Sequence, residues 1–495
     1  MNPKADEDIL NNLPLGLCYL AAVVKEMHHA VEVIDLNAIH IREDLINVLL
    51  NGVDILGITT TAPAIYQVLD IAKTVKTFSP HTYVCLGGPH ATFAYNDILS
   101  RHHEIDFIIM GEGEEILARV LEAYSAGQVI NGIPGIAYRD LSGKVIAIPM
   151  TSCGDIDGYP MPLRNCAENS KSRAKRKGVR HVVSEIITAR GCPGHCSFCV
   201  SNVNSCIRWR HREINSIEKE IECLVEQGTN GLYFVDVDFF ASHEHAENVI
   251  NITNKFPQIK QVFIVTRVAS LLREKELFLR LLDIGLSGVE LGMESGSQTA
   301  LNRYNKNITV RENMDAMEFL NVCRGKRRFV VTCDMIMFDP MGTYAELIEN
   351  YQMMEKCKMT NKDYEECLFT CLYFLPGSDL YNKSLIEGTI GASLDVPYIR
   401  FADDVVANIY AYTVLYKQYL LPEVRAIRAK IKESLIEPNG MENKMKMAGL
   451  AVQMNDISFK YFKELLDTRG NRLMMANIYD EYKHRVSEHA KKCMK

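Results

Sequence analysis

The sequence lacks the features that would place the chain in a membrane or on nucleic acid. No stretch approaches the roughly 18 to 20 apolar residues of a membrane-spanning helix, and the opening residues MNPKADEDIL contain no apolar signal-peptide core. The chain has no excess of positive charge, since its net charge is −7 at pH 7. We therefore expect a cytoplasmic protein with reduced thiols, no transmembrane segment and no nucleic-acid partner.

Internal repeats and low-complexity tracts are also absent. The 495 residues, 47% hydrophobic and 24% charged, exceed what one hydrophobic core usually supports. We therefore predict four parts: a first α/β domain at residues 1–150, a linker at 151–183, a second β/α domain at 184–387 and a helical C-terminal domain at 388–495.

The first domain alternates between helical and strand periodicity. Four apolar runs have the strand pattern, at residues 31–36, 53–59, 82–88 and 105–111. Residues 132–149 have the pattern of a closing hairpin. Runs that are apolar on both faces, such as DILGIT and DFIIMG, are typical of a parallel sheet covered by helices on both sides. The pattern predicts a doubly wound, Rossmann-like fold.

A second β/α series begins at residue 184. Its six predicted strands cover residues 184–190, 231–238, 261–267, 288–295, 329–338 and 367–375. Right-handed crossovers make a partial (β/α)6 barrel the simplest topology, with catalysis at the carboxyl ends of the strands.

The strongest chemical signal is the segment TARGCPGHCSFCV after the first of these strands. Cys192, Cys196 and Cys199 are spaced CxxxCxxC on one loop. Thiolates select zinc or iron–sulfur clusters; structural zinc needs four protein ligands, whereas three cysteines on a four-iron cluster leave one iron open for chemistry. A zinc site would need a fourth ligand, for which three residues lie near in the sequence: His195, Cys206 and His211.

In this segment the sequence resembles the radical S-adenosylmethionine (SAM) superfamily, whose signature is this cysteine triad after the first barrel strand. The resemblance implies a [4Fe-4S] cluster held by Cys192, Cys196 and Cys199. It also implies reductive cleavage of SAM to a 5′-deoxyadenosyl radical, with a flavodoxin- or ferredoxin-type electron donor. Six further residues match SAM-binding positions: Phe198, Asp236, Asp238, Arg267, Glu294 and Ser295. The segment VDVDFF departs from the family's Gly-Gly-Glu, so Asp236 or Asp238 would substitute for its glutamate.

Three strand ends in the first domain are rich in glycine or small residues: GITTTAP, LGGPHAT and GEGEE. Each alone also fits an ordinary strand-to-helix turn. Together with PLGLCYLAAVV they resemble the cobalamin-binding domain fused to radical SAM barrels. The resemblance implies cobalamin contacts at seven residues: Thr59, Thr60, Gly87, Gly88, Gly111, Glu112 and Gly113.

Two features depart from that resemblance. The chain has no DxHxxG segment, so no histidine of that motif can ligate cobalt, and His90 is a poor substitute. The apolar first strand that usually precedes the PLGL helix is also missing, which would leave a gap in the sheet.

The resemblance as a whole implies an enzyme for a small-molecule or natural-product substrate, most consistent with cobalamin-dependent methylation of an unactivated carbon. Two alternatives stay open. One is a radical oxidative cyclase or rearrangement enzyme of the same architecture. The other is a binding protein stapled by zinc.

Overall fold

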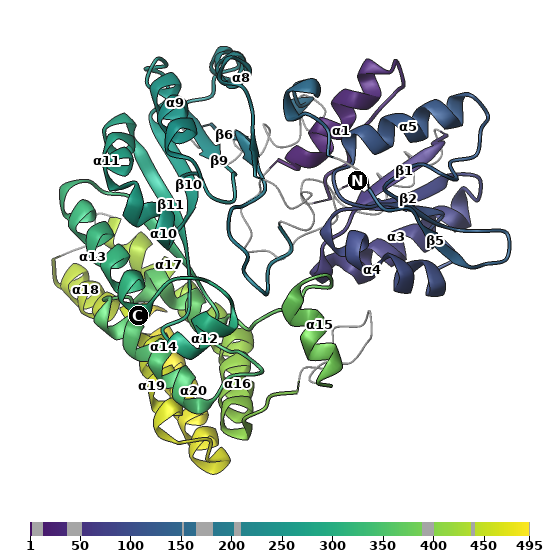
Figure 1. Ribbon diagram of the computed structural model, residues 1–495. Helices are drawn as coiled ribbons and strands as arrows, with labels where there is room; N and C mark the ends of the chain where they lie inside the picture. The colour runs from purple at the N-terminus through teal and green to yellow at the C-terminus, as the bar shows by residue number, and fades with distance from the viewer. Residues whose placement is uncertain are drawn as a thin grey trace.

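In the computed structural model two α/β units are followed by a helical region (Figure 1). The structure describes residues 1, 13–36, 52–150, 153–164, 182–201, 209–388, 400–436 and 441–494, so most of the predicted linker lies outside the described residues. Among the described helices, none has the length and apolar character of a membrane span.

The first unit contains a five-stranded sheet with the order β1-β2-β3-β4-β5. The strands β1 (Ile55–Thr59), β2 (Tyr83–Gly87) and β3 (Phe107–Ile109) are parallel, and β4 (Ile136–Arg139) and β5 (Val145–Ala147) add the predicted antiparallel hairpin. The helices are α1 (Leu15–Glu26), α3 (Ile65–Phe78), α4 (Pro89–Arg101) and α5 (Glu114–Ser125).

The side chains of this sheet alternate between two apolar clusters. Val84 and Leu86 pack into a cluster with α3 and α4, whereas Cys85 between them packs into a cluster with α5. Because successive strand residues point to opposite faces, helices on both sides explain why the strands are apolar throughout. The predicted doubly wound fold is confirmed.

The sheet differs from the prediction at its first edge. Residues 31–36 form no regular strand, although Ile34 and Leu36 are buried in the core. Met1 lies next to β1: its ammonium group donates to the Gly57 carbonyl at 2.5 Å and its carbonyl accepts from Thr59 N at 3.0 Å. In the described part of the chain the expected strand at 31–36 is therefore replaced by irregular backbone that still buries two side chains.

The second unit contains five parallel strands in the order β12-β11-β10-β9-β6. They are β6 (Val183–Ile186), β9 (Gly231–Phe234), β10 (Gln261–Arg267), β11 (Leu286–Glu294) and β12 (Val330–Met335). The connecting helices are α8 (Ile214–Glu226), α9 (His243–Thr253), α10 (Val268–Arg273), α11 (Lys275–Ile284), α12 (Gln298–Arg303), α13 (Val310–Lys326) and α14 (Tyr344–Lys356). Two short strands, β7 (Ala189–Arg190) and β8 (Arg210–His211), pair separately.

The predicted sixth strand at 367–375 is wrong. Its first residues end the 3-10 helix η4 (Lys362–Phe369), and only one parallel bridge, between Phe338 and Cys371, joins the rest to the segment after β12. One bridge does not extend into a ladder, because Pro376 and Gly377 soon turn the chain toward α15 (Asp379–Ile386). The described sheet is therefore a five-stranded partial barrel.

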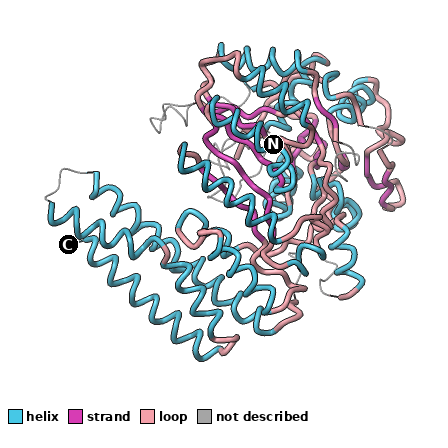
Figure 2. The backbone as a smooth tube through the Cα atoms, turned by 60° about the vertical axis from the view of Figure 1, so that its left-hand side comes forward, coloured by secondary structure: helices cyan, strands magenta, loops and turns pink. Residues whose placement is uncertain are grey.

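The C-terminal region is helical, as predicted (Figure 2). It consists of α16 (Asp404–Leu415), a π-helical turn η5 (Tyr416–Leu420), α17 (Leu421–Ile436), α18 (Met441–Asn455), α19 (Ile457–Asp467) and α20 (Arg472–Met494). Its apolar side chains join the barrel's core: the rings of Phe338 and Phe462, for example, lie 5.9 Å apart. The region is therefore packed onto the barrel and extends its core.

The described cysteines are free thiols with the exception of Cys153, which is disulfide-bonded. The expectation of reduced thiols is wrong at that position.

Candidate functional site

Cys192, Cys196 and Cys199 lie on the segment Gly191–Val200 that follows β7, here called the cysteine loop. All three are partly buried. The sulfur of Cys192 accepts from Gly194 N at 3.3 Å and that of Cys199 from Ser201 N at 3.4 Å. Burial raises the pKa of Cys192 and of Cys196. Thiolates at these positions therefore need positive charge nearby, whether from a bound metal or from side chains.

The end of α12 and the residues after it hold the cysteine loop. Ser197 donates its N–H to the Tyr304 carbonyl at 2.9 Å and its hydroxyl to the Arg303 carbonyl at 2.8 Å. Asn305 donates its side-chain amide to the His195 carbonyl at 2.7 Å. These contacts join segments more than a hundred residues apart and fix the middle of the loop.

Two cations face the cysteine loop. The Arg267 guanidinium lies against Gly194, where an added Cβ would be 2.6 Å from Cζ. The Lys306 ammonium lies 2.7 Å from Glu294 Oε1, and the field of both cations opposes the effect of burial on the pKa of Cys196. Three soft sulfur ligands with cationic neighbours are the donor set that suits an iron–sulfur cluster. Cys192, Cys196 and Cys199 therefore fit this cofactor.

The zinc interpretation finds no support in the geometry. Cys206 lies outside the described residues. The ring of His211 packs against those of Trp209 and His245, at centroid distances of 5.2 and 4.7 Å.

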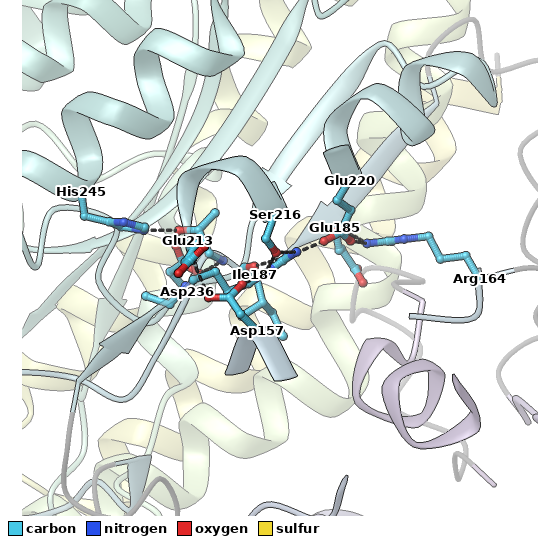
Figure 3. Close-up of polar contacts among 12 residues, drawn as sticks. Asp157, Arg164, Glu185, Ile187, Glu213, Ser216, Glu220, Asp236 and His245 are labelled. Carbon is cyan, nitrogen blue, oxygen red and sulfur yellow. Dashed lines mark hydrogen bonds and ion pairs between the residues drawn. The ribbon is translucent and has the colours of Figure 1, made fainter. Parts of the chain in front are cut away.

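The two aspartates after β9 are engaged by internal donors (Figure 3 shows Asp236). Asp236 Oδ1 accepts from Thr188 N at 2.7 Å and Ala189 N at 2.9 Å, and Oδ2 accepts from the Thr188 hydroxyl. Burial raises the pKa of Asp236 to about 6. Asp238 accepts from the Ser270 hydroxyl at 2.6 Å. Asp236 thus holds the turn before the cysteine loop, and its contact with SAM stays a prediction.

The predicted residues at the end of β11 have different surroundings. Ser295 is fully buried and its hydroxyl donates to Asn350 Oδ1 at 2.7 Å. Glu294 pairs with Lys306 beside the cysteine loop and has a left-handed φ of 68°, a strained conformation for this residue type. Phe198 contacts the Tyr304 ring edge to face at 5.5 Å. The predicted SAM contacts stay predictions for all six residues: Phe198, Asp236, Asp238, Arg267, Glu294 and Ser295.

The three glycine-rich strand ends of the first sheet lie together, as expected for neighbouring parallel strands. Thr60 N donates to the Gly87 carbonyl at 2.8 Å, and Gly111 N donates to the Thr92 hydroxyl at 2.9 Å. Gly88 has a φ of 93°, and a Cβ there would lie 3.0 Å from the Thr60 carbonyl oxygen. Thr60 itself is fully buried and supports this turn, and its contact with cobalamin stays a prediction.

The other predicted cobalamin contacts are partly exposed: Thr59, Gly87, Gly88, Gly111 and Gly113. Beside them His90 is 7% exposed, and neither of its ring nitrogens has a hydrogen-bond partner. Burial lowers the pKa of His90 to about 4, so the ring is neutral at pH 7. A buried imidazole without a partner fits a polar group of a bound cofactor at this edge.

Glu112 belongs to a cluster of charges that joins the two units. Its carboxylate pairs with Arg190 at 3.1 Å and with Arg210, and Glu114 pairs with Arg190 at 2.6 Å. We call these four residues the interdomain clamp. Arg190 stands two residues before Cys192, so the clamp connects the end of β3 directly to the base of the cysteine loop. The predicted contact of Glu112 with cobalamin stays a prediction.

The structure combines a doubly wound domain with a partial β/α barrel that carries a three-cysteine loop, and a cluster of charges joins the two. This is the architecture of a radical enzyme with two cofactor domains. The family models agree: "B12 binding domain" matches residues 11–121 and "Radical SAM superfamily" matches residues 186–354. The chain belongs to the radical SAM superfamily and carries an N-terminal B12-binding domain.

Similar proteins include methyltransferases and cyclases. The chain is 30% identical over 309 residues to an uncharacterized methyltransferase of Pyrococcus horikoshii, covering 62% of this chain and 66% of the relative. It is 32% identical over 279 residues to the anaerobic magnesium-protoporphyrin IX monomethyl ester cyclase of Rubrivivax gelatinosus, covering 54% and 48%. The chain thus spans about half to two thirds of the length of these relatives.

Two solved structures share the fold. The cobalamin-dependent SAM radical enzyme OxsB, with aqua-cobalamin and SAM bound, superposes with a TM-score of 0.75 at 17% identity, covering 98% of this chain and 74% of OxsB. The radical SAM methyltransferase TsrM from Kitasatospora setae, with cobalamin and a [4Fe-4S] cluster bound, gives 0.58 at 18% identity, covering 72% and 69%.

Several residues of this site were missed from the sequence: Lys306, Asn305, Arg190 and Arg210. Nothing in their local pattern distinguishes them from surface charges or a helix end. Their place depends on contacts between segments far apart in the chain.

Proposed function

We propose that the protein is a cobalamin-dependent radical SAM methyltransferase that methylates an unactivated carbon of a small molecule. The observation that carries this proposal is the interdomain clamp, which ties the cofactor edge of the B12-binding domain to the cysteine loop. Methyl transfer of this kind requires both cofactors close to one substrate, and a buried network of charges is suited to hold the two domains in register.

When bound, the cluster with SAM supplies a hydrogen-abstracting radical, and cobalamin supplies a methyl carrier. The chain's own residues hold and screen these groups. Cys192, Cys196 and Cys199 would ligate the cluster, while Arg267 and Lys306 compensate its negative charge. Helix α1 packs against Ile187 and Val235 at the strand ends of the barrel, where it limits the access of water.

The substrate would lie inside the partial barrel. Tyr233 is on β9 and Glu290 on β11, the two strands that flank β10, and the phenol donates to the carboxylate at 3.4 Å. Both groups are only partly buried, so they are available to a ligand. A flavodoxin- or ferredoxin-type protein would supply the electron.

The test is anaerobic reconstitution with iron, sulfide and hydroxocobalamin, followed by reduction in the presence of SAM. We expect about four irons and one cobalt per chain, deoxyadenosine as a product, and label from the SAM methyl group in candidate substrates. The Cys196→Ala variant should lose cluster and deoxyadenosine, whereas Cys223→Ala on α8 should keep both. A Cys196→Ala protein that still forms deoxyadenosine contradicts the proposal.

The cyclase relatives favour a second candidate function, a radical oxidative cyclase of the same architecture. The same experiment separates the two. Deoxyadenosine formation without movement of methyl label, in a reaction that consumes the substrate, favours the cyclase.

A further inference from the structure

Lys306 lies buried beside the cysteine loop, and the proposed function assigns it no role beyond charge compensation. Its side chain is 4% exposed, and it follows directly on Tyr304 and Asn305, whose hydrogen bonds hold the loop. The Lys306 carbonyl also accepts from the Arg267 guanidinium at 3.3 Å. The position of Lys306 relative to the cysteines is therefore fixed from several sides.

The structure makes room for the charged end of Lys306. A Cβ added to Gly292 on β11 would lie 3.1 Å from the Lys306 ammonium and 3.0 Å from Glu294 Oε1. The ion pair of Lys306 and Glu294 thus packs against Gly292, which has no side chain. The backbone of Glu294, Asn305 and Asn307 is left-handed, with φ of 68°, 50° and 55°. Only the glutamate is strained in this conformation, since asparagine adopts it readily.

The Lys306 ammonium interacts with several charged groups nearby. Glu294 is its hydrogen-bonded partner, and the groups that interact with it electrostatically include Cys196 and Arg267. Asp334 on β12, which pairs with Gly292 across the sheet, also lies within its field. The lysine is therefore hydrogen-bonded to a carboxylate and lies within electrostatic range of a cysteine of the loop.

We propose that Lys306 is a positioning residue that raises the reduction potential of the iron–sulfur cluster, with Glu294 opposing it. The inference rests on the proposed function, since it requires that the cysteine loop hold a cluster. Reduction adds one negative charge to a centre already carrying three thiolates, and a fixed cation in a poorly solvated site stabilises the reduced state. The carboxylate of Glu294 holds the ammonium in place and offsets part of its charge.

The test is a redox titration of the reconstituted holoprotein, followed by electron paramagnetic resonance of the reduced cluster. Lys306→Met should make the cluster about tenfold harder to reduce, which is a shift of −59 mV for a one-electron couple. Lys306→Arg keeps the charge and should stay close to wild type. The exposed Lys326 on α13 provides the control, and Lys326→Met should leave the potential unchanged.

Glu294→Gln should shift the potential in the opposite direction, because it removes the negative charge and leaves the lysine. A purely structural role for the pair predicts loss of iron in both variants with no opposite shifts. If Lys306→Met does not retain iron, the proposal is decided by whether Glu294→Gln raises the reduction potential. The inference is overturned if Glu294→Gln fails to raise the potential, or if Lys306→Met retains its cluster at the wild-type potential. A wild-type protein without any cluster would instead refute the proposed function.

Discussion

Replacing Arg190 with glutamine is expected to weaken the contact between the B12-binding domain and the cysteine loop. Arg190 is 13% exposed, and its partners Glu112 and Glu114 are 8% and 6% exposed. The Arg190 guanidinium also lies over the rings of Tyr19 and Tyr159, at 5.4 and 5.7 Å from their centroids. Its loss leaves two buried carboxylates with less positive charge.

The expected cost is about 3 kcal/mol, since removing one partner of a buried ion pair leaves an uncompensated charge. The matched control is an exposed ion pair on α5, the helix that carries Glu114. Arg119 and Glu115 lie four residues apart on α5 and are 48% and 41% exposed, so Arg119→Gln should cost less than about 0.5 kcal/mol. The difference between the two variants measures the effect of burial.

Urea unfolding monitored by tryptophan fluorescence suits this measurement. The chain has one tryptophan, Trp209, which directly precedes Arg210 of the clamp. With a slope of about 3 kcal/mol per molar urea, the Arg190→Gln midpoint should fall by about 1 M. Adding Glu114→Gln should recover part of the loss, because it removes one unpaired carboxylate. Equal midpoints for Arg190→Gln and Arg119→Gln would refute the reasoning.

Three further predictions concern the sheet interior and the cysteine loop. Burial raises the pKa of Asp334 to about 7 from 3.8, so its stabilising contribution is present at low pH and is lost as the pH rises through about 7. Asp334→Asn should therefore be more stable than wild type at about pH 8, with an advantage in urea midpoint that shrinks toward about pH 5.5; an advantage independent of pH contradicts this. Asp236→Ala leaves two backbone N–H groups without their acceptor and should lower the unfolding free energy by about 2 kcal/mol, with Asp236→Asn less affected; equal stability to wild type would refute the anchoring role. Gly194→Ala should reduce the iron bound per chain at least about twofold, because the new Cβ meets Arg267, whereas Gly325→Ala, with no atom within 4 Å, should bind iron like wild type. Unchanged iron in Gly194→Ala would count against the packing argument.

The cysteine spacing and the alternation of strands and helices were readable from the sequence, because both are local patterns. CxxxCxxC places three thiolates on one loop whatever surrounds it, and runs apolar on both faces can be buried only inside a covered sheet. The segments at 31–36 and 367–375 show where local patterns fail. Both have strand character, but among the described residues neither forms a regular strand, and a single bridge joins the segment at 367–375 to its neighbour.

The sequence by itself thus determined the three-cysteine motif, the two α/β units and the resemblance that points to SAM and cobalamin. Only the tertiary structure decided what the charged residues do. Glu112 pairs with Arg190 across 78 positions, and Asp236 binds the backbone of Thr188 across 48. The charge of a carboxylate is visible in the sequence, but its partner is chosen by the packing of distant segments, because burying a charge requires the nearest available counter-charge or donor.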